Sequence, residues 1–295
     1  MSSSLPGEVA MRGRRFRTQA DIDHYVKQGF GQGEACSYLP WIRVQDVPSR
    51  GRSRKTWGLK AQRLHHTLSD LEYGYFLLLE FSDEVVDIRE QYPIFPTENA
   101  RKIAIDLGIR YPMYASTKLH YVITSDFLVT IERNGQRSLV VRTCKYEQEL
   151  ADPVHGPRVI EKLELEKAIW LSQGVPDWKL VTEKTVTPTL TDNLDWVRKS
   201  VKGERGAADI DTLQRFLEVI DAAADPERTL ASVLRSAANA SRLAYSAGVA
   251  LFAQLVWTKV IKLDLVNTRI ELRSACPSMQ VLGVSHHHTE LTQVA

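Results

Sequence analysis

The feature that most constrains the fold is a β-hairpin signal at residues 121–145. The segment YVITSDFLVTIE (Tyr121 to Glu132) is rich in β-branched and aromatic residues, which favour strands. Asn134-Gly135 follows it, and this pair is the strongest short hairpin signal because both residues tolerate positive φ. A second β run extends from Leu139 to Lys145. Two strands alone are marginal in water, so a larger sheet with packed helices is expected around this hairpin.

Further elements flank the hairpin on both sides. Local patterns predict a helix from Ser69 to Phe81, a strand from Val85 to Tyr92, a helix from Val159 to Gln173 and a short strand from Lys179 to Thr182. Residues 46–60, which include one proline and two glycines, are predicted as a loop. The order helix, strand, hairpin, helix, strand predicts an α/β fold, in which helices pack on a mixed sheet.

The sequence changes character after about residue 184. Residues 208–257 are rich in Ala and Leu and predict helices with breaks near Pro226 and Gly248. Trp257 to Leu272 alternates like a strand or hairpin. Helices followed by a short hairpin favour a smaller, mainly helical, winged-helix-like domain. We therefore expect three parts: a first domain at 1–183, a second at 184–275 and a disordered tail at 276–295.

The sequence also indicates where the protein is located and which chemistry its cysteines support. No apolar run reaches the roughly 18 residues of a membrane helix, and no signal peptide is recognisable, so a cytoplasmic location without membrane contact is expected. Three well-separated cysteines support neither a disulfide framework nor a CxxC metal site. The tail carries His286, His287 and His288; we interpret them as solvent-exposed residues, with a metal clip as the less favoured alternative.

Positive charge is concentrated near the start of the chain. Residues 1–66 hold 12 Lys/Arg against 5 Asp/Glu, a surplus of seven, whereas the whole chain is at +2 and the remainder is therefore at −5. The stretch from residue 50 to 63 contains six basic residues and no acid: Arg50, Arg52, Arg54, Lys55, Lys60 and Arg63. Such a run is either a solvated face or a strip that binds DNA phosphates.

One acid is unusual within the hairpin. Asp126 lies in a run of apolar and hydroxylic residues, where a carboxylate is disfavoured unless it is paired or binds a metal. Strand alternation is expected to place Thr143 and Lys145 on one face of the returning strand. An acid on one strand and a lysine on the next can form a metal-and-lysine site. Without further context, an ordinary Asp–Lys pair remains the more economical reading.

A second acid stands at the start of the predicted helix. Glu72 shares its face with Phe76 and Leu79, and Ser69-x-x-Glu72 also matches a capping box, in which the glutamate would bond the N-cap amide. From this segment alone the cap is the favoured interpretation, and a metal-binding role is the alternative. The order helix acid, strand acid, strand lysine is the order in which nucleases of the restriction-endonuclease-like fold supply their catalytic groups.

Five segments resemble the TnsA endonuclease family and occur in the family's order over roughly residues 20–200. They are GFGQGEACSYLPWIRVQDVPSRGRS (Gly29 to Ser53), HHTLSDLEYGYFLLLEFSDEVVDIREQYPI (His65 to Ile94), IAIDLGIRYP (Ile103 to Pro112), TSDFLV (Thr124 to Val129) and EKLELEKAIW (Glu161 to Trp170). Five collinear segments are more specific than any single short motif.

The resemblance implies both a fold and an activity. It implies a restriction-endonuclease-like mixed sheet with flanking helices and a metal-dependent DNA endonuclease that cuts the 5′ ends of a transposon. It also implies two protein partners: a DDE-type transposase subunit (TnsB-like), which cuts the 3′ ends, and an AAA+ ATPase regulator (TnsC-like). The family's C-terminal region docks this regulator, and target choice rests largely with partners.

By the same resemblance, the family's glutamate, aspartate and lysine fall on Glu72, Asp126 and Lys145. Glu72 and Asp126 are expected to bind Mg²⁺, with Mn²⁺ able to substitute. A well-known family member carries glutamine where this chain has Thr143. We therefore expect Thr143 to serve the metal through its backbone carbonyl.

Two alternatives stay open at this point. The chain could be a catalytically impaired adaptor that binds DNA and protein in the same complex, for which Thr143 is the best argument. It could also be a stand-alone restriction-type endonuclease, which would show the same acid–lysine pattern.

Overall fold

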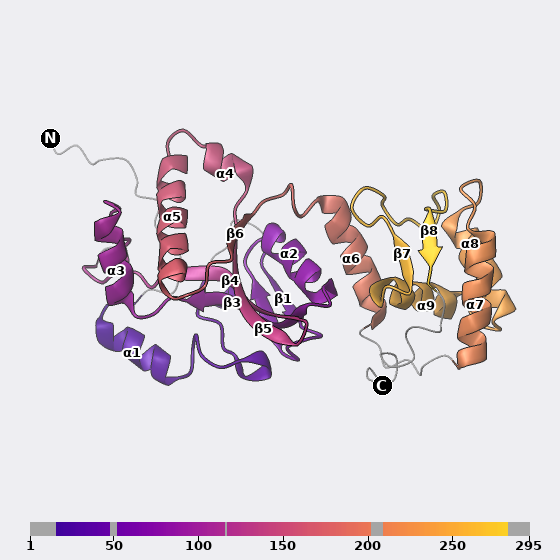
Figure 1. The fold of residues 1–295 in the computed structure, drawn as a ribbon, viewed down its shortest axis with the longest axis horizontal. Coiled ribbons are helices and arrows are strands. Elements are labelled where there is room, and N and C mark those ends of the chain that lie inside the picture. Colours follow the sequence, from indigo (N-terminus) through magenta and orange to yellow (C-terminus); the bar gives the residue numbers. More distant parts are fainter. Residues whose placement is uncertain (1–15, 48–51, 116, 202–208, 283–295) are drawn as a thin grey trace. The chain divides into compact units, whose positions relative to one another are not determined.

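The computed structural model describes residues 16–47, 52–115, 117–201 and 209–282 (Figure 1). The chain divides into two compact units, Met1–Val186 and Thr187–Ala295. Each unit has its own buried core and is described by itself below.

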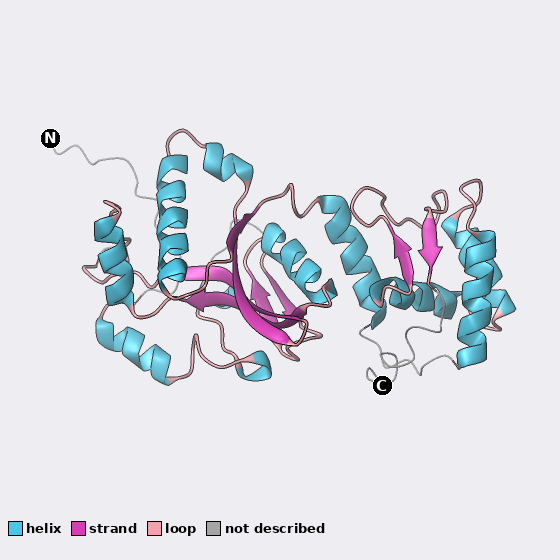
Figure 2. Cartoon of the chain, viewed as in Figure 1, coloured by secondary structure: helices cyan, strands magenta, loops and turns pink. Residues whose placement is uncertain are grey.

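A four-stranded sheet organises the first unit (Figure 2). Its strands are β3 (Val85–Pro93), β4 (Thr124–Arg133), β5 (Gln136–Cys144) and β6 (Trp178–Val181), in the order β3-β4-β5-β6. β3, β4 and β5 are antiparallel neighbours, whereas β5 and β6 run parallel, so the sheet is mixed as predicted. Asn134 and Gly135 form the hairpin turn with φ of 51° and 74°. These left-handed values explain why this pair terminates the strand.

Helices cover both faces of this sheet. Leu128 of β4 packs in one core with residues of α3 (Thr97–Asp106) and α5 (Gly156–Ser172). The neighbouring Phe127 instead contacts Tyr75 of α2 (Asp70–Phe81), with 5.7 Å between ring centroids. Successive strand residues point to opposite faces, so α2 lies across the sheet from α3 and α5. This α/β arrangement is the restriction-endonuclease-like fold expected from the sequence. A short helix, α4 (Glu147–Ala151), leads into α5.

Before α2 the chain forms smaller elements. They are α1 (Gln19–Lys27), two 3₁₀ turns η1 (Ala35–Ser37) and η2 (Val44–Asp46), and the antiparallel strands β1 (Arg54–Trp57) and β2 (Leu64–Thr67). The prediction of a loop over 46–60 was therefore wrong for β1. Its turn is held by a distant residue: the Glu80 carboxylate accepts the amides of Leu59 and Lys60 at 2.7 and 3.2 Å. Such long-range contacts leave no local pattern.

The second unit is mainly helical in its described part. Its elements are α6 (Pro188–Val201), α7 (Ile210–Ala223), α8 (Leu230–Ala240), α9 (Tyr245–Trp257) and the antiparallel strands β7 (Ile261–Leu263) and β8 (Met279–Val281). Within the described ranges, no helix has the length and apolar character needed to span a bilayer.

Two predictions for this region are corrected. The break expected near Gly248 lies instead between Ala240 and Tyr245, and Gly248 is inside α9. A Cβ there would stand 2.7 Å from the Cβ of Ala238, so glycine permits close helix packing rather than a turn. The disordered tail was expected from Cys276, yet β8 pairs with β7 and Cys276 is buried. Residues 283–295, with the three histidines, lie outside the described residues.

Candidate functional site

Glu72 sits in the first turn of α2 with its side chain buried. Its amide donates to Ser69 Oγ at 3.1 Å, and Ser69 Oγ donates to Glu72 Oε1 at 3.0 Å. The amide of Leu68 donates to Glu72 Oε2 at 2.8 Å. Ser69 therefore caps the helix as expected, but the Glu72 carboxylate bonds the amide of Leu68 and the hydroxyl of Ser69 rather than the N-cap amide of the predicted capping box. These bonds also fix the direction of the carboxylate.

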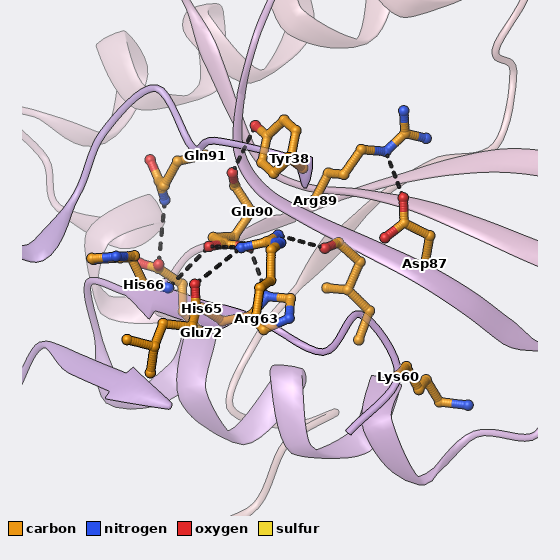
Figure 3. A network of polar contacts seen from close by, with 12 residues as sticks. Tyr38, Lys60, Arg63, His65, His66, Glu72, Asp87, Arg89, Glu90 and Gln91 are labelled. Carbon is orange, nitrogen blue, oxygen red and sulfur yellow. Dashed lines mark hydrogen bonds and ion pairs between the residues drawn. The ribbon is translucent and has the colours of Figure 1, made fainter. Parts of the chain in front are cut away.

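Asp126 comes from β4 and is held by the neighbouring strand. Its Oδ2 accepts the amide of Cys144 at 2.7 Å. Gln91 of β3 then connects Asp126 to Glu72: its Nε2 donates to Asp126 Oδ1 and to Glu72 Oε2, each at 3.3 Å. Figure 3 shows the bond between Gln91 and Glu72. The two carboxylates selected from the sequence therefore lie on either side of one amide nitrogen.

The electrostatics of this pair are unusual. Burial, and secondly the charge of Asp126, raise the pKa of Glu72 to about 8. The backbone amide of Leu68 and the charge of Lys145 act in the opposite direction. The raised pKa means that the surroundings do not fully offset two ionised carboxylates, so Glu72 holds a proton that a bound cation would replace.

Lys145 is the first residue after β5 and is partly buried. Its Nζ donates to the carbonyl of Cys144 at 2.9 Å. Burial would lower the pKa of Lys145, but the carboxylates of Asp126, Glu149 and Glu72 outweigh it and raise the pKa. The lysine is therefore a permanent cation in the field of both acids.

Thr143 has a different environment from Lys145. Its buried Oγ1 donates to Glu166 Oε1 at 2.5 Å, on α5. The common face of Thr143 and Lys145 stays a prediction: β5 ends at Cys144, although the Lys145 amide still donates to the Val181 carbonyl of β6 at 3.0 Å. The Thr143 side chain is engaged in this bond, which leaves its backbone carbonyl as the group relevant to the sequence prediction.

Two buried polar residues at this end of the sheet were missed from the sequence. Glu166 accepts hydrogen bonds from Ser125, Thr143 and Trp178, and burial raises its pKa to about 7. A signal for it existed, because Glu166 lies at helical spacing from the apolar Leu163 and Ile169. Gln91 offered no such signal, since a glutamine in a strand is ordinary.

The predicted basic strip is divided by the structure. Arg50 lies outside the described residues, and Arg52 and Lys55 are exposed. Arg54 forms an ion pair with Asp70 at 2.7 Å and lies over the ring of Tyr73. Lys60 is partly exposed.

Arg63 is separated from the rest of the strip, because it points into the protein. Its guanidinium makes two bonds to the Glu90 carboxylate, at 2.9 and 2.6 Å, and one to the Ile88 carbonyl at 2.8 Å (Figure 3). His65 Nδ1 and the amide of His66 also contact Glu90, at 2.8 and 3.0 Å. An arginine used in this way is not available to a phosphate.

The donors that this site offers to a metal are the carboxylates of Glu72 and Asp126. Among the described residues, no group of three or more His, Cys, Asp and Glu side chains could hold an ion. Mg²⁺ does not require such a cage, because it is commonly bound by one or two carboxylates and keeps several waters. Two adjacent carboxylates, with the pKa of Glu72 raised to about 8, fit that pattern.

Comparison with known proteins gives two findings. Residues 82–183 match the family model described as the TnsA-like endonuclease N-terminal domain. The chain is also 37% identical over 193 residues to the Transposon Tn7 transposition protein TnsA of Escherichia coli, a match that covers 65% of this chain and 67% of that protein. The match to the family model extends from β3 to β6 and so includes Asp126 and Lys145, whereas Glu72 precedes it.

Proposed function

This chain belongs to the TnsA family, and from that premise we propose that it is a Mg²⁺-dependent endonuclease that cuts the 5′ ends of a transposon. The observation that carries the proposal is the Glu72–Gln91–Asp126 arrangement beside Lys145. The two acids come from α2 and β4, and the lysine follows the end of β5. These are the elements that the sequence prediction named.

Each residue has a defined role in this mechanism. Glu72 and Asp126 would hold Mg²⁺ through their carboxylates; the Thr143 carbonyl lies on the edge of β5 that faces β6, whereas the Cys144 backbone faces Asp126. The bound ion would polarise the scissile phosphate and lower the pKa of an attacking water. The Lys145 ammonium orients that water and offsets charge that develops on the phosphoryl oxygens. Water oxygen bonds to phosphorus as the bond to the 3′ oxygen breaks, which leaves a 5′-phosphate and a 3′-hydroxyl.

DNA would be gripped by the exposed part of the basic run. Arg52 and Lys55 are exposed, Lys60 is partly exposed, and Arg54 pairs with Asp70 at the start of α2; Arg50 belongs to the same run. Arg63 is left out because Glu90 already binds it. Phosphate contacts confer affinity but no sequence preference, so the choice of site falls to partners.

We further propose that this subunit works with a DDE-type transposase and an AAA+ regulator. The relative from Escherichia coli is named as a transposition protein of Tn7. The nuclease groups all come from the first unit, which leaves the second unit, Thr187–Ala295, free to bind the regulator. The catalytically impaired adaptor is less favoured, because the Thr143 side chain is engaged by Glu166 while Glu72, Asp126 and Lys145 remain together.

The decisive experiment is cleavage of labelled transposon ends by the full chain with its partners. Asp126→Ala should abolish 5′-strand cleavage, because it removes a carboxylate that holds the Lewis acid. Asp106→Ala is the matched control, since Asp106 is an exposed acid on α3. EDTA should abolish cleavage and Mg²⁺ should restore it. Full 5′ cleavage by Asp126→Ala, or by the native chain in EDTA, would show that the proposal is wrong.

A further inference from the structure

Gln91 is the residue whose role remains to be explained. It lies on β3 and is 3% exposed. Each carboxylate has its own local anchor: Leu68 and Ser69 hold Glu72, and Cys144 holds Asp126. These anchors belong to different elements and do not connect the acids to each other. The Gln91 amide does connect them, through bonds of 3.3 Å to both.

The backbone of Gln91 is in a costly conformation. Its φ is 48°, in the left-handed region that side-chain-bearing residues seldom adopt because it strains the backbone. The residue interrupts the β3–β4 pairing between the Glu90–Phe127 and Tyr92–Ser125 pairs. Its carbonyl accepts the amide of Trp41 at 3.2 Å, which fixes the peptide from the other side.

A left-handed residue within a strand turns its side chain away from the regular alternation. At Gln91 this brings the amide between two carboxylates that would otherwise repel. The cost is typical of functional sites, where strain is retained because the surrounding structure holds it and the geometry is used. Glutamine suits the position because its neutral N–H₂ can donate two bonds without adding charge.

We propose that Gln91 is a positioning residue whose amide sets the separation of Glu72 and Asp126 before the divalent cation binds. This inference rests on the proposed function, since it assumes that the two carboxylates share a metal. Hydrogen-bonding partners of metal ligands commonly contribute about 10- to 100-fold in affinity, because they hold the ligands in place. The single side-chain amide of Gln91 holds both proposed ligands, Glu72 and Asp126.

A purely structural role for Gln91 makes a different prediction. If only its left-handed backbone mattered, Gln91→Gly and Gln91→Asn should behave like the native chain, because glycine and asparagine suit positive φ best. Glycine removes the amide, and asparagine, shorter by one methylene, cannot span both carboxylates. Under the positioning role both substitutions should therefore weaken metal binding while the fold is kept.

The chain also offers a matched control. Gln62 has φ of 50° and is exposed, and its amide donates to the Leu59 carbonyl in the turn between β1 and β2. Gln62→Gly makes the same chemical change in the same backbone conformation away from the carboxylates. It should leave metal binding within about twofold of the native value, whereas Gln91→Gly should weaken it about tenfold or more.

The test is Mn²⁺ binding by the full chain, followed by calorimetry or by loss of the free-ion paramagnetic resonance signal. Thermal unfolding in EDTA verifies the fold of each variant. With partners present, Gln91→Asn should raise the Mg²⁺ concentration for half-maximal cleavage more than it lowers the rate at saturating Mg²⁺. Should Gln91→Gly fail to fold, the Gln91→Asn affinity decides alone.

The outcomes separate this inference from the proposed function. Native Mn²⁺ affinity retained in Gln91→Gly or Gln91→Asn would overturn the positioning role, provided that Asp126→Ala still abolishes binding. If the native chain bound no Mn²⁺ and Asp126→Ala cut normally, the proposed metal centre itself would be wrong. A tenfold loss in both Gln91 variants, with Gln62→Gly unchanged, would support both.

Discussion

Glu72 and Glu90 are both buried in the first unit, yet their surroundings treat their charge in opposite ways. Glu90 is 0% exposed and is surrounded by Arg63, His65 and the amide of His66. Burial alone would raise its pKa, but His65 and Arg63 outweigh burial and hold it well below its usual range. Glu72 accepts neutral donors and faces Asp126, and its pKa rises to about 8.

The difference separates an acid that its neighbours already neutralise from an acid that we propose as a metal ligand. The Glu90 cluster already contains its cation, so it has nothing to gain from an ion. The Glu72 pair lacks a full counter-charge within the described residues, apart from Lys145, and a divalent ion would supply it. Glu90 and Gln91 are adjacent in β3, so a single strand serves both clusters.

The largest expected effect in this comparison is on stability at the Glu90 cluster. Arg63→Met should lower the free energy of unfolding by about 3–5 kcal/mol, because it leaves a buried carboxylate without its partner. Arg137→Met is the control: its pair with Glu132 is exposed and screened by solvent, so its loss should leave the free energy of unfolding almost unchanged. Chemical denaturation measures both. Equal losses would mean that the Glu90 cluster is not the structural element inferred here.

The two glutamates should also give opposite pH dependences. The folded pKa of Glu72, about 8, exceeds its reference value of 4.5, so its contribution is fully present below pH 4.5 and is lost as pH rises toward 8. The folded pKa of Glu90 is depressed, so its contribution is present above pH 4.5 and is lost in acid.

Unfolding in EDTA from pH 5 to 8 tests this sign. The native chain should lose on the order of a few kcal/mol relative to Glu72→Gln over that range. Mg²⁺ should bind more tightly as pH rises, because the ion must replace the proton of Glu72. A Glu72→Gln variant whose stability follows the native pH profile would contradict the assignment of the raised pKa to Glu72.

The two clusters also differ in how far the sequence revealed them. Asp126 and Glu72 were identifiable because each breaks a local pattern, an acid in a β run and an acid on an apolar helix stripe. Arg63 looked like part of a basic strip, since neighbours in sequence were all basic, and only the distant Glu90 shows that it points inward. Gln91 and the β1–β2 turn held by Glu80 depend in the same way on contacts between elements.

A smaller effect is expected within the active cluster itself. Lys145→Ala should reduce 5′ cleavage about a hundredfold, the scale of one lost transition-state contact. Thr143→Ala should reduce it less, because the backbone carbonyl survives and only the hydroxyl bond to Glu166 is lost. Single-turnover cleavage at saturating Mg²⁺ compares the two. If Thr143→Ala reduced the cleavage rate more than Lys145→Ala, the hydrogen bonds to Glu166 would contribute to catalysis.

Removal of the whole second unit should have the smallest effect on the proposed metal site. The sequence placed the end of the first domain at Glu183, whereas the compact unit extends to Val186, which is buried. A chain of residues 1–186 keeps β6, which completes the sheet, and should bind Mn²⁺ within about twofold of the full chain. Its DNA affinity should still fall with salt, because the basic run before α2 remains.

Binding to the AAA+ regulator should be lost, since we assign that role to the second unit. Calorimetry or pull-down measures this. Regulator binding by residues 1–186 as tight as by the full chain would show that assignment to be wrong, and the nuclease assignment would stand, because Glu72, Asp126 and Lys145 all lie before the cut.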